Sequence, residues 1–566
     1  MTITEILNKR PVILGSRERY DLRCVPFSTR GSFMCIVEDQ EDRNLYLSIS
    51  RSPAFMMERK NLVRIVPVVD NKEISFEYSA EPGKMTIKTY RGTAEICFAD
   101  KKQIRIRGEG ISLRFYFKMQ MFENCSPKEN GDFEIAYEIL GKLLFVPLKG
   151  AVWCNAKWNC ETVQAEDFII DLIPPVETMR FETAVHEYYS NRMRDNEYVP
   201  FDDCVRMAEE DFKKFCKRFG EVPEKYSDMA LLAAFTIWTH QIGPEGRLKN
   251  SLVYMSRTSS VRAFGYQQCY QAMASGGDIR EAWKMLLSMF DYQNEAGQIP
   301  FYVSDISMSW LAACAPLHGA ALDYVFNMCD SDELKKEDYA GLYGKMSGYA
   351  GWLLDKRDRN RSGIPQYYRA DECGWIDAKA FKNGRPVQSA DLLALTVLLT
   401  EYCGRLAIMA GNETEAGKWM NESKRLLAIL ENEFWDGRKF VSKDAQTGEI
   451  VETGVTASLL PVILGKRLRE DIVNAIVNRL TSEDECRKDI SPISCLLPIG
   501  LCNAGKKELA FIIAGRFCDM VCEAVENKAD KGKIENKKTK QDFVNGLTSE
   551  MAAAFLITVS YVLGEE

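Results

Sequence analysis

Short apolar segments alternate with polar positions through the first 175 residues. Typical examples read SFMCIVED, LVRIVPVV, QIRIRG and LRFYFKMQMF, and glycine, proline, asparagine or aspartate separate them. A period of two, with β-branched and aromatic residues, predicts strands. Because no helical pattern lies between these segments, the strands are expected to pair antiparallel. We therefore predict an antiparallel β-sandwich over residues 1–176.

The hydrophobic period changes to that of helices after Phe201. Residues 177–200 are interpreted as a helical linker, with a helix at Phe181–Arg194. Beyond this linker the pattern predicts helices at Asp203–Phe219, Ser227–Ile242, Asp278–Asn294, Met308–Met328, Glu333–Asp355, Ser389–Ala410, Glu413–Phe434, Arg467–Leu480, Lys506–Glu526 and Thr548–Leu563, with shorter ones near Phe264–Ala274 and Pro492–Leu501. Antiparallel helix pairs that close into a toroid over residues 201–566 would bury all their apolar faces. An elongated solenoid is the alternative, but no internal repeat supports it.

Composition narrows the class of protein. With 46% hydrophobic and 27% charged residues and a net charge of −8, the chain has the balance of a globular protein. It offers no broad basic surface, so no nucleic-acid partner is expected. No apolar run reaches the roughly 18 residues of a membrane span, so no membrane partner is expected. The 18 cysteines are scattered through apolar patterns, which favours buried free thiols in a reducing cytoplasm. The oligomeric state is not encoded in these patterns.

Carboxylates lie beside aromatic residues and glycines in the connections between predicted helices. The segments read DYQ (291–293), GQIP (297–300), PLHG (316–319), RD (357–358), GIPQYY (363–368), DECGWIDA (371–378) and PVQSADL (386–392). Carboxylates can bind hydroxyl groups or protonate a leaving oxygen, and an aromatic face can cover a sugar ring. The pattern is compatible with a saccharide site, and equally with ordinary loop and capping residues.

The order and spacing of these segments resemble the inverting glycoside hydrolases with an (α/α)6 barrel, namely family 63 processing glucosidases and trehalases. The likeness covers most of the helical region and includes EAGKWMNESKRLLAILENEFWDGRKF (Glu415–Phe440) with its W-D-x-x-x-F turn. LGKLLFVPLKG (Leu140–Gly150) resembles the β-sandwich that often precedes such barrels. The resemblance implies inverting hydrolysis of an α-linked glucoside or a similar small saccharide, in a pocket at the barrel mouth.

The resemblance also implies two catalytic carboxylates, a general acid and a general base, roughly 6.5–9.5 Å apart. The family's acid lies in a D/E-S-G-W-D segment. Here Glu372–Trp375 fits that segment and is followed by Ile376, so the acid would be Asp377, one residue later, or Glu372. The family's base lies in an E-N-x-x-x-x-G segment, which Glu526 begins in this chain.

Further residues are implied as sugar contacts: Trp375, Tyr266, Gln267, Arg357, Gln388, Tyr368 and Trp310. Two segments depart from the family pattern. Tyr266 and Gln267 stand where relatives carry a Trp-Asp pair, and Ser491–Cys495 replaces an R-G-P-x-W segment. With Ile376, these departures leave open a second hypothesis, a barrel that binds a saccharide or a partner without hydrolysis.

A third hypothesis is a sugar isomerase or lyase, which typically uses histidine bases. The chain has three histidines, His186, His240 and His318, and each is interpreted as structural. The sequence has no phosphate-binding glycine loop, nucleophile elbow or H-E-x-x-H segment. Cys518 and Cys522 lack the further ligands of a zinc site. Neither a cofactor nor a metal is expected.

Overall fold

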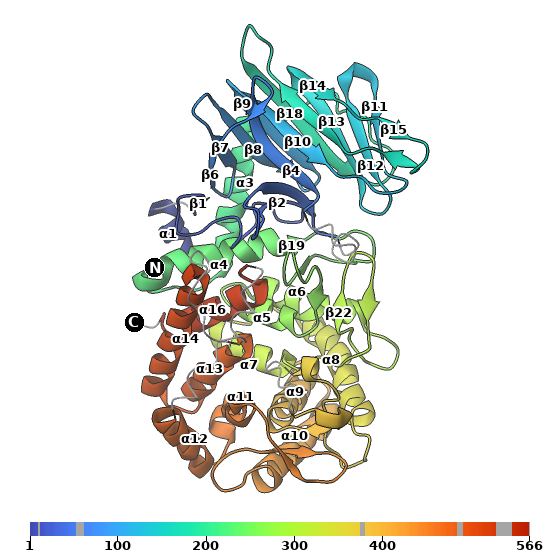
Figure 1. The fold of residues 1–566 in the computed structure, drawn as a ribbon. Helices are drawn as coiled ribbons and strands as arrows, with labels where there is room; N and C mark the ends of the chain where they lie inside the picture. The colour runs from blue at the N-terminus through green and yellow to red at the C-terminus, as the bar shows by residue number, and fades with distance from the viewer. Residues whose placement is uncertain (10–11, 52–60, 374–379, 484–490, 528–545, 565–566) are drawn as a thin grey trace.

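The computed structural model describes residues 1–9, 12–51, 61–373, 380–483, 491–527 and 546–564. The N-terminal part is built from antiparallel sheets and the C-terminal part from helices (Figure 1). This agrees with the predicted mixed class of β and α regions. Both chain ends lie on the helical side of the molecule (Figure 1).

The largest sheet has nine antiparallel strands. Their order across the sheet is β1 (Leu14–Gly15), β6 (Glu77–Ala80), β7 (Met85–Lys88), β8 (Thr93–Asp100), β9 (Gln103–Glu109), β18 (Arg180–Tyr188), β13 (Gly141–Lys149), β12 (Phe133–Tyr137) and β11 (Asn124–Pro127). A second sheet contains β14 (Ala151–Cys154), β17 (Phe168–Ile173), β10 (Ser112–Phe117), β4 (Val63–Val69), β3 (Leu45–Ile49) and β2 (Met34–Glu38), and β5 (Lys72–Glu73) pairs with β4.

Apolar faces of the two sheets meet in the N-terminal core. Phe145 of β13 lies with its ring centroid 5.4 Å from that of Phe115 and 6.0 Å from that of Phe117, both on β10. All three side chains are buried. The alternation of apolar and polar positions that predicts strands in the sequence therefore directs one face of each sheet into a shared core.

The predicted helix at Phe181–Arg194 is wrong. Residues Arg180–Tyr188 form β18, which pairs antiparallel with both β9 and β13 inside the nine-stranded sheet. Seven of its nine residues are buried, and the strand carries the β-branched and aromatic residues that favour sheet. Long-range pairing with two neighbours prevails over the local helical pattern, so the segment after residue 177 is not a helical linker.

The helical part begins with α3 (Phe201–Phe215), which packs against β8. The helices that follow are α4 (Ser227–His240), α5 (Gln267–Ala274), α6 (Ile279–Ser288), α7 (His318–Met328), α8 (Lys336–Lys356), α9 (Ala390–Met409), α10 (Glu413–Glu433), α11 (Val455–Leu459), α12 (Glu470–Ser482), α13 (Leu496–Asn503), α14 (Lys507–Asn527) and α16 (Ser549–Tyr561). A further helix, α1 (Ile3–Lys9), packs on α4. A 3₁₀ segment, η7 (Leu460–Arg467), continues α11.

Six helical elements contact one another in a closed order. α5 contacts α7, α7 contacts α9, α9 contacts η7, η7 contacts α13, α13 contacts α16, and α16 returns to α5. A second set packs outside them, with α4 on α16, α6 on α5, α8 and α10 on α9, α12 on η7 and α14 on α13. Figure 1 shows these helices arranged around a common centre below the sheets.

The helix predicted at Met308–Met328 begins ten residues too early. Met308–Ser309 form strand β23, which pairs with β22 (Tyr302–Val303), and the helix starts at His318. Pro316 explains the late start, because proline has no amide hydrogen and disfavours helical conformation in the residue before it. The sequence analysis also missed α1 and the α11–η7 segment. α11–η7 is short and contains Pro461 and a kink at Gly465.

Two buried arginines join the sheets to the helices. Arg257, in the connection after α4, donates to the Ser50 hydroxyl at 2.9 Å, to the Thr239 carbonyl at 2.7 Å and to the Met34 carbonyl at 3.0 Å. Arg51, from the sheet part, pairs with Glu187 at 3.0 Å and with Glu245 of the helical part at 2.8 Å. Buried charges are tolerated only when they are paired in this way, so the two parts have a fixed relationship.

α9 is the one described helix that is long and apolar enough to cross a membrane by length and composition. Of the 18 consecutive residues that make up its most apolar stretch, 78% are buried within the protein.

Candidate active site

The connections between helices are unequal in length at the two ends of the helical part. Long connections lead into the six contacting elements, at residues 241–266, 289–317, 357–389, 434–454, 483–495 and 528–548. Short connections lead out of them, at residues 275–278, 329–335, 410–412, 468–469 and 504–506. Short loops join antiparallel neighbours, so the long connections gather at one end, which we call the loop end. The sequence-predicted site residues that the structure describes belong to the loop end or its border.

Glu372 is buried at the loop end, with 2% of its surface exposed. Its carboxylate pairs with the guanidinium of Arg357. It also accepts hydrogen bonds from the backbone N–H groups of Ala313 at 2.9 Å, Tyr368 at 2.6 Å and Arg369 at 3.3 Å. These donors occupy acceptor sites of the carboxylate. Glu372 therefore ties two long connections together.

Arg357 and Tyr368 belong to the same cluster. Arg357 is 6% exposed and lies with its guanidinium 3.6 Å from the centroid of the Tyr368 ring, while the Arg359 guanidinium lies 4.3 Å from it. Two cations over one ring leave less of its face free for a sugar. The structure thus brings together three of the predicted site residues, Arg357, Tyr368 and Glu372.

Asp377 and Trp375 lie outside the described residues, but both flanks of their segment are fixed. Cys373 is 3% exposed and Ala380 is 1% exposed. Both belong to a small apolar cluster with Tyr367, Val387 and Leu392. Cys373 and Ala380 are therefore both packed into one apolar cluster at the loop end.

Gln267 opens α5 and is fully buried. Its amide nitrogen donates to the Ser549 hydroxyl at 2.6 Å, and its amide oxygen accepts from the backbone N–H of Phe264 at 3.2 Å. The side chain thus connects α5 to α16. Neighbouring Tyr266 is half-buried, with its ring 5.8 Å from that of Phe264. Gln267 has a structural partner for each polar atom, so a role in gripping a sugar is not evident from its contacts.

Gln388 and Trp310 occupy different surroundings. Gln388, on β24 (Val387–Gln388), is 6% exposed and donates to the Ser362 hydroxyl at 2.7 Å. Trp310 is 37% exposed in the connection before α7, where its carbonyl accepts a hydrogen bond from Gln298 at 2.9 Å. Of the described residues predicted to contact sugar, Trp310 presents the most open aromatic side chain.

Glu526 lies in the last turn of α14, and its carboxylate pairs with Arg19 from the segment before β2. The side chain is 36% exposed. This ion pair joins residues that are 507 positions apart in the sequence. The structure thus places the predicted general base at the border between the helices and the N-terminal part, with a cation beside it.

Glu550 is a carboxylate that the sequence analysis missed. It lies in the first turn of α16 and is 8% exposed. Burial chiefly raises the pKa values of Tyr270 on α5 and of Cys495 just before α13, and the charge of Glu550 contributes to both increases. The carboxylate therefore lies near three elements of the closed set. Its signal in the sequence was one acid at the start of the apolar run SEMAAAFLITVSYVL.

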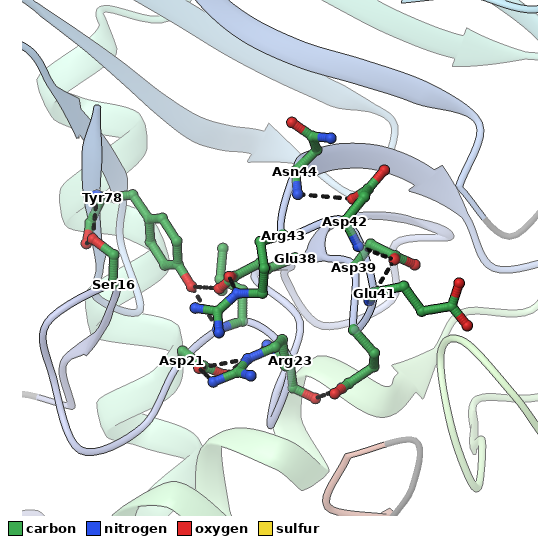
Figure 2. A network of polar contacts seen from close by, with 12 residues as sticks. Ser16, Asp21, Arg23, Glu38, Asp39, Glu41, Asp42, Arg43, Asn44 and Tyr78 are labelled. Atoms are coloured by element: carbon green, nitrogen blue, oxygen red, sulfur yellow. Dashed lines mark hydrogen bonds and ion pairs between the residues drawn. The ribbon is translucent and has the colours of Figure 1, made fainter. Parts of the chain in front are cut away.

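A small cavity lies where the sheet part meets the loop end. It has a volume of about 40 Å³ and is lined by Arg23, Glu38, Asp39, Asn61, His240, Ser256, Thr258 and Leu547, among others. Figure 2 shows the polar network on its sheet side. Glu38 accepts from Tyr78 and Arg43, while Arg23 donates to Asp21 at 2.8 Å. A cavity of this size suits a few water molecules rather than a sugar ring.

The three histidines are buried and poorly suited to be bases. Burial, followed by the charge of Arg257, lowers the pKa of His240 to about 3. Burial lowers the pKa of His318 to about 4 and, as the main cause, that of His186 to about 4. His186 lies in β18, within the nine-stranded sheet. Among the described residues, no group of three or more His, Cys, Asp or Glu side chains is arranged to hold a metal ion.

Comparisons with known proteins indicate the type of fold. No protein-family model matches the sequence, and no curated protein matches it. The structure of the GH63 mannosylglycerate hydrolase from Thermus thermophilus in complex with glucose is similar over 58% of this chain and 99% of that chain, with 14% identity and a TM-score of 0.46. The structure of the GH92 family glycosyl hydrolase ccman5 is similar over 90% of this chain and 79% of that chain, with 9% identity and a TM-score of 0.50. The likeness to the GH92 structure indicates that the chain has a glycoside hydrolase-like fold, and membership of family 63 does not follow from these comparisons.

Proposed function

We propose that the protein is an inverting glycosidase acting on an α-linked glucoside or a similar small saccharide. The fold would be a β-sandwich followed by an (α/α)6 toroid, with the saccharide bound at the loop end. Because β18 belongs to the nine-stranded sheet, we place the boundary between the two domains near Pro200, and the toroid at 201–566. The closed order of helix contacts supports this arrangement.

The observation that carries the proposal is the fixed position of Glu372 and Ala380 at the loop end. Glu372 is bound by Arg357 and three backbone N–H groups on one side, and Ala380 is buried on the other. A general acid must be held within hydrogen-bonding reach of the glycosidic oxygen. We assign the general acid to Asp377, as the resemblance implies, and a positioning role to Glu372, which anchors the connection before it.

The general base is assigned to Glu526, as the resemblance implies, with Glu550 as the alternative. Glu526 is accessible at the border of the loop end but is paired with Arg19. Glu550 is more buried and begins an element of the closed set. In an inverting mechanism the base removes a proton from a water molecule as that water attacks the anomeric carbon. The two candidates differ in accessibility, so mutation distinguishes them.

A histidine-dependent isomerase finds no support in the described residues, because all three imidazoles are buried and have lowered pKa values. One specific observation favours the hypothesis of saccharide binding without hydrolysis. Gln267, where relatives carry an acid, is fully engaged by Ser549 and Phe264. Hydrolysis and binding assays distinguish this second hypothesis from the first.

The test is hydrolysis of α- and β-linked disaccharides and aryl glycosides, with NMR detection of the first anomer formed. The variants are Asp377→Asn, Glu526→Gln and Glu550→Gln. The matched control is Asp371→Asn, which alters an exposed acid in the same connection that pairs with Arg369. We expect turnover with inversion, and a loss of about a hundredfold or more in Asp377→Asn and in one base variant. Turnover that survives in Asp377→Asn would disprove the assignment of the acid. Thermal stabilisation by a saccharide without turnover would support the binding-only hypothesis.

A further inference from the structure

A row of alternating charges crosses the outward face of the nine-stranded sheet. The strand register places Glu95 of β8 opposite Arg107 of β9, Arg107 opposite Glu182 of β18, and Glu182 opposite Lys149 of β13. Arg107 pairs with Glu95 at 2.7 Å. Such cross-strand pairs stabilise a sheet, so the row by itself indicates no ligand.

Cavities border this row of charges. Two cavities, of about 530 Å³ and 310 Å³, share Arg107 and Glu182 as lining residues. The segment 194–202, which leads from the sheet into α3, lines most of one side of the larger cavity. We call these two adjacent cavities the sheet groove. Their volumes lie in the range of sites that bind small molecules.

The sheet groove has no net charge. The larger cavity is lined by three arginines, Arg105, Arg107 and Arg194, and by three acids, Glu182, Asp195 and Asp202. The smaller cavity is lined by the cations Arg107, Lys149 and Arg180 and by the acids Glu95, Glu109 and Glu182. Because each set of cations is matched by an equal set of anions, the groove provides no net attraction for an anionic ligand. It favours a neutral ligand that can both donate and accept hydrogen bonds.

Arg105 provides a second, independent observation. Its side chain lines the larger cavity and is 2% exposed, and its guanidinium lies 5.3 Å from the centroid of the Tyr198 ring. It pairs with Glu182, yet its Nε–H has no hydrogen-bond partner. An unpartnered buried donor is costly, so the Arg105 guanidinium keeps hydrogen-bonding capacity that its protein partners do not use.

We propose that the sheet groove binds a neutral oligosaccharide. The hydroxyl groups of a sugar donate to carboxylates and accept from guanidinium groups, and such bonds to charged partners are stronger than those between neutral groups. The two adjacent cavities favour a ligand of more than one ring. This site goes beyond the proposed function, since it lies on the sheet part and requires no hydrolysis at the loop end.

The experiment is isothermal titration of the full chain with maltohexaose, cellohexaose and mannohexaose. At least one of these should bind, and its affinity should fall about tenfold or more in Arg107→Gln and in Glu182→Gln, the loss expected when a hydrogen bond to a charged group is removed. Arg180→Gln, at a side chain that is 60% exposed, provides a variant that will fold even if the others are destabilised. It should also weaken binding.

The matched control is Arg64→Gln on the other sheet. Arg64 pairs with Glu73 at 2.6 Å and lies 4.1 Å from the centroid of the Tyr116 ring, as Arg107 pairs with Glu95 and lies 4.1 Å from the Phe201 ring. This control should leave the affinity unchanged. The proposal is overturned if no hexasaccharide binds, if binding survives in the folded groove variants, or if glucuronate or inorganic phosphate binds the groove more tightly. Loss of turnover in Asp377→Asn with hexasaccharide binding intact would separate this site from the loop end.

Discussion

The guanidinium of Arg357 and the carboxylate of Glu372 form an ion pair with 8% and 0% of their side chains exposed. Removing one partner of a buried pair leaves the other charge uncompensated, which typically costs about 3–5 kcal/mol. Glu372→Ala should therefore lower the free energy of unfolding by about that amount, measured by urea denaturation. The adjacent exposed pair, Arg369 with Asp371 at 2.6 Å, is the control. Asp371→Ala should cost about 0–1 kcal/mol. Equal effects of the two changes would show that Glu372 is not an anchor.

The pairing of Arg19 with Glu526 allows a test of the general base by comparison of two variants. If Glu526 is the base, Glu526→Gln should lower kcat by about a hundredfold or more. Arg19→Gln, which removes only its partner, should change kcat far less. If the pair only holds the N-terminal segment on α14, the two variants should have similar, small effects on kcat. In that case Glu550→Gln should give the large loss.

The imidazole of His318 should remain neutral in the folded protein well below pH 6.5. Its ring lies beside that of Phe290, with ring centroids 4.8 Å apart and planes tilted by 46°, and burial lowers its pKa to about 4 from an ordinary value of 6.5. The unfolded chain therefore binds more protons between about pH 6.5 and 4. The contribution of this group to stability is present above pH 6.5 and is lost as the pH falls toward 4.

With three histidines in the chain, proton NMR can follow each imidazole, and His318→Leu assigns one signal. This signal should not shift between pH 7.5 and 5.5. The variant should also show a weaker dependence of the urea midpoint on pH in the range from 6.5 to 4. A His318 signal that titrates near pH 6.5 would contradict the burial described here.

Gly319 should not tolerate a side chain. A Cβ atom there would lie 2.3 Å from the backbone of Leu398 and Leu399, where α7 packs against α9. Gly319→Ala should destabilise the protein by about 1–3 kcal/mol or more, because the two helices must move apart. Gly344 in α8 has nothing within 4 Å of such an atom. Gly344→Ala should stabilise by about 0.5–1 kcal/mol through helix propensity. The melting temperatures of both variants, measured by calorimetry, test these two predictions. Stabilisation by Gly319→Ala would refute the close packing of α7 on α9.

Local patterns determined much of the fold. The period of apolar residues predicts α10 at Glu413–Phe434, and the structure has Glu413–Glu433. It also predicts a helix at Ser389–Ala410, where the structure has α9 at Ala390–Met409, followed by Gly411 with a φ of +80°. These features depend on residues close in sequence, since a helix buries one face whatever lies opposite it. The division into a sheet region and a helical region follows for the same reason.

Features that depend on contacts between residues far apart in the sequence were decided only by the tertiary structure. β18 is a strand because β9 and β13 supply its hydrogen bonds, and no local pattern contains that information. Glu372 has the residue type of a catalytic acid, but Arg357 and the backbone of Ala313 make it an anchor. The alternating row of Glu95, Arg107, Glu182 and Lys149 exists only through strand register. The sequence determines which side chains are available, while burial and long-range contacts determine which of their polar atoms remain free for chemistry.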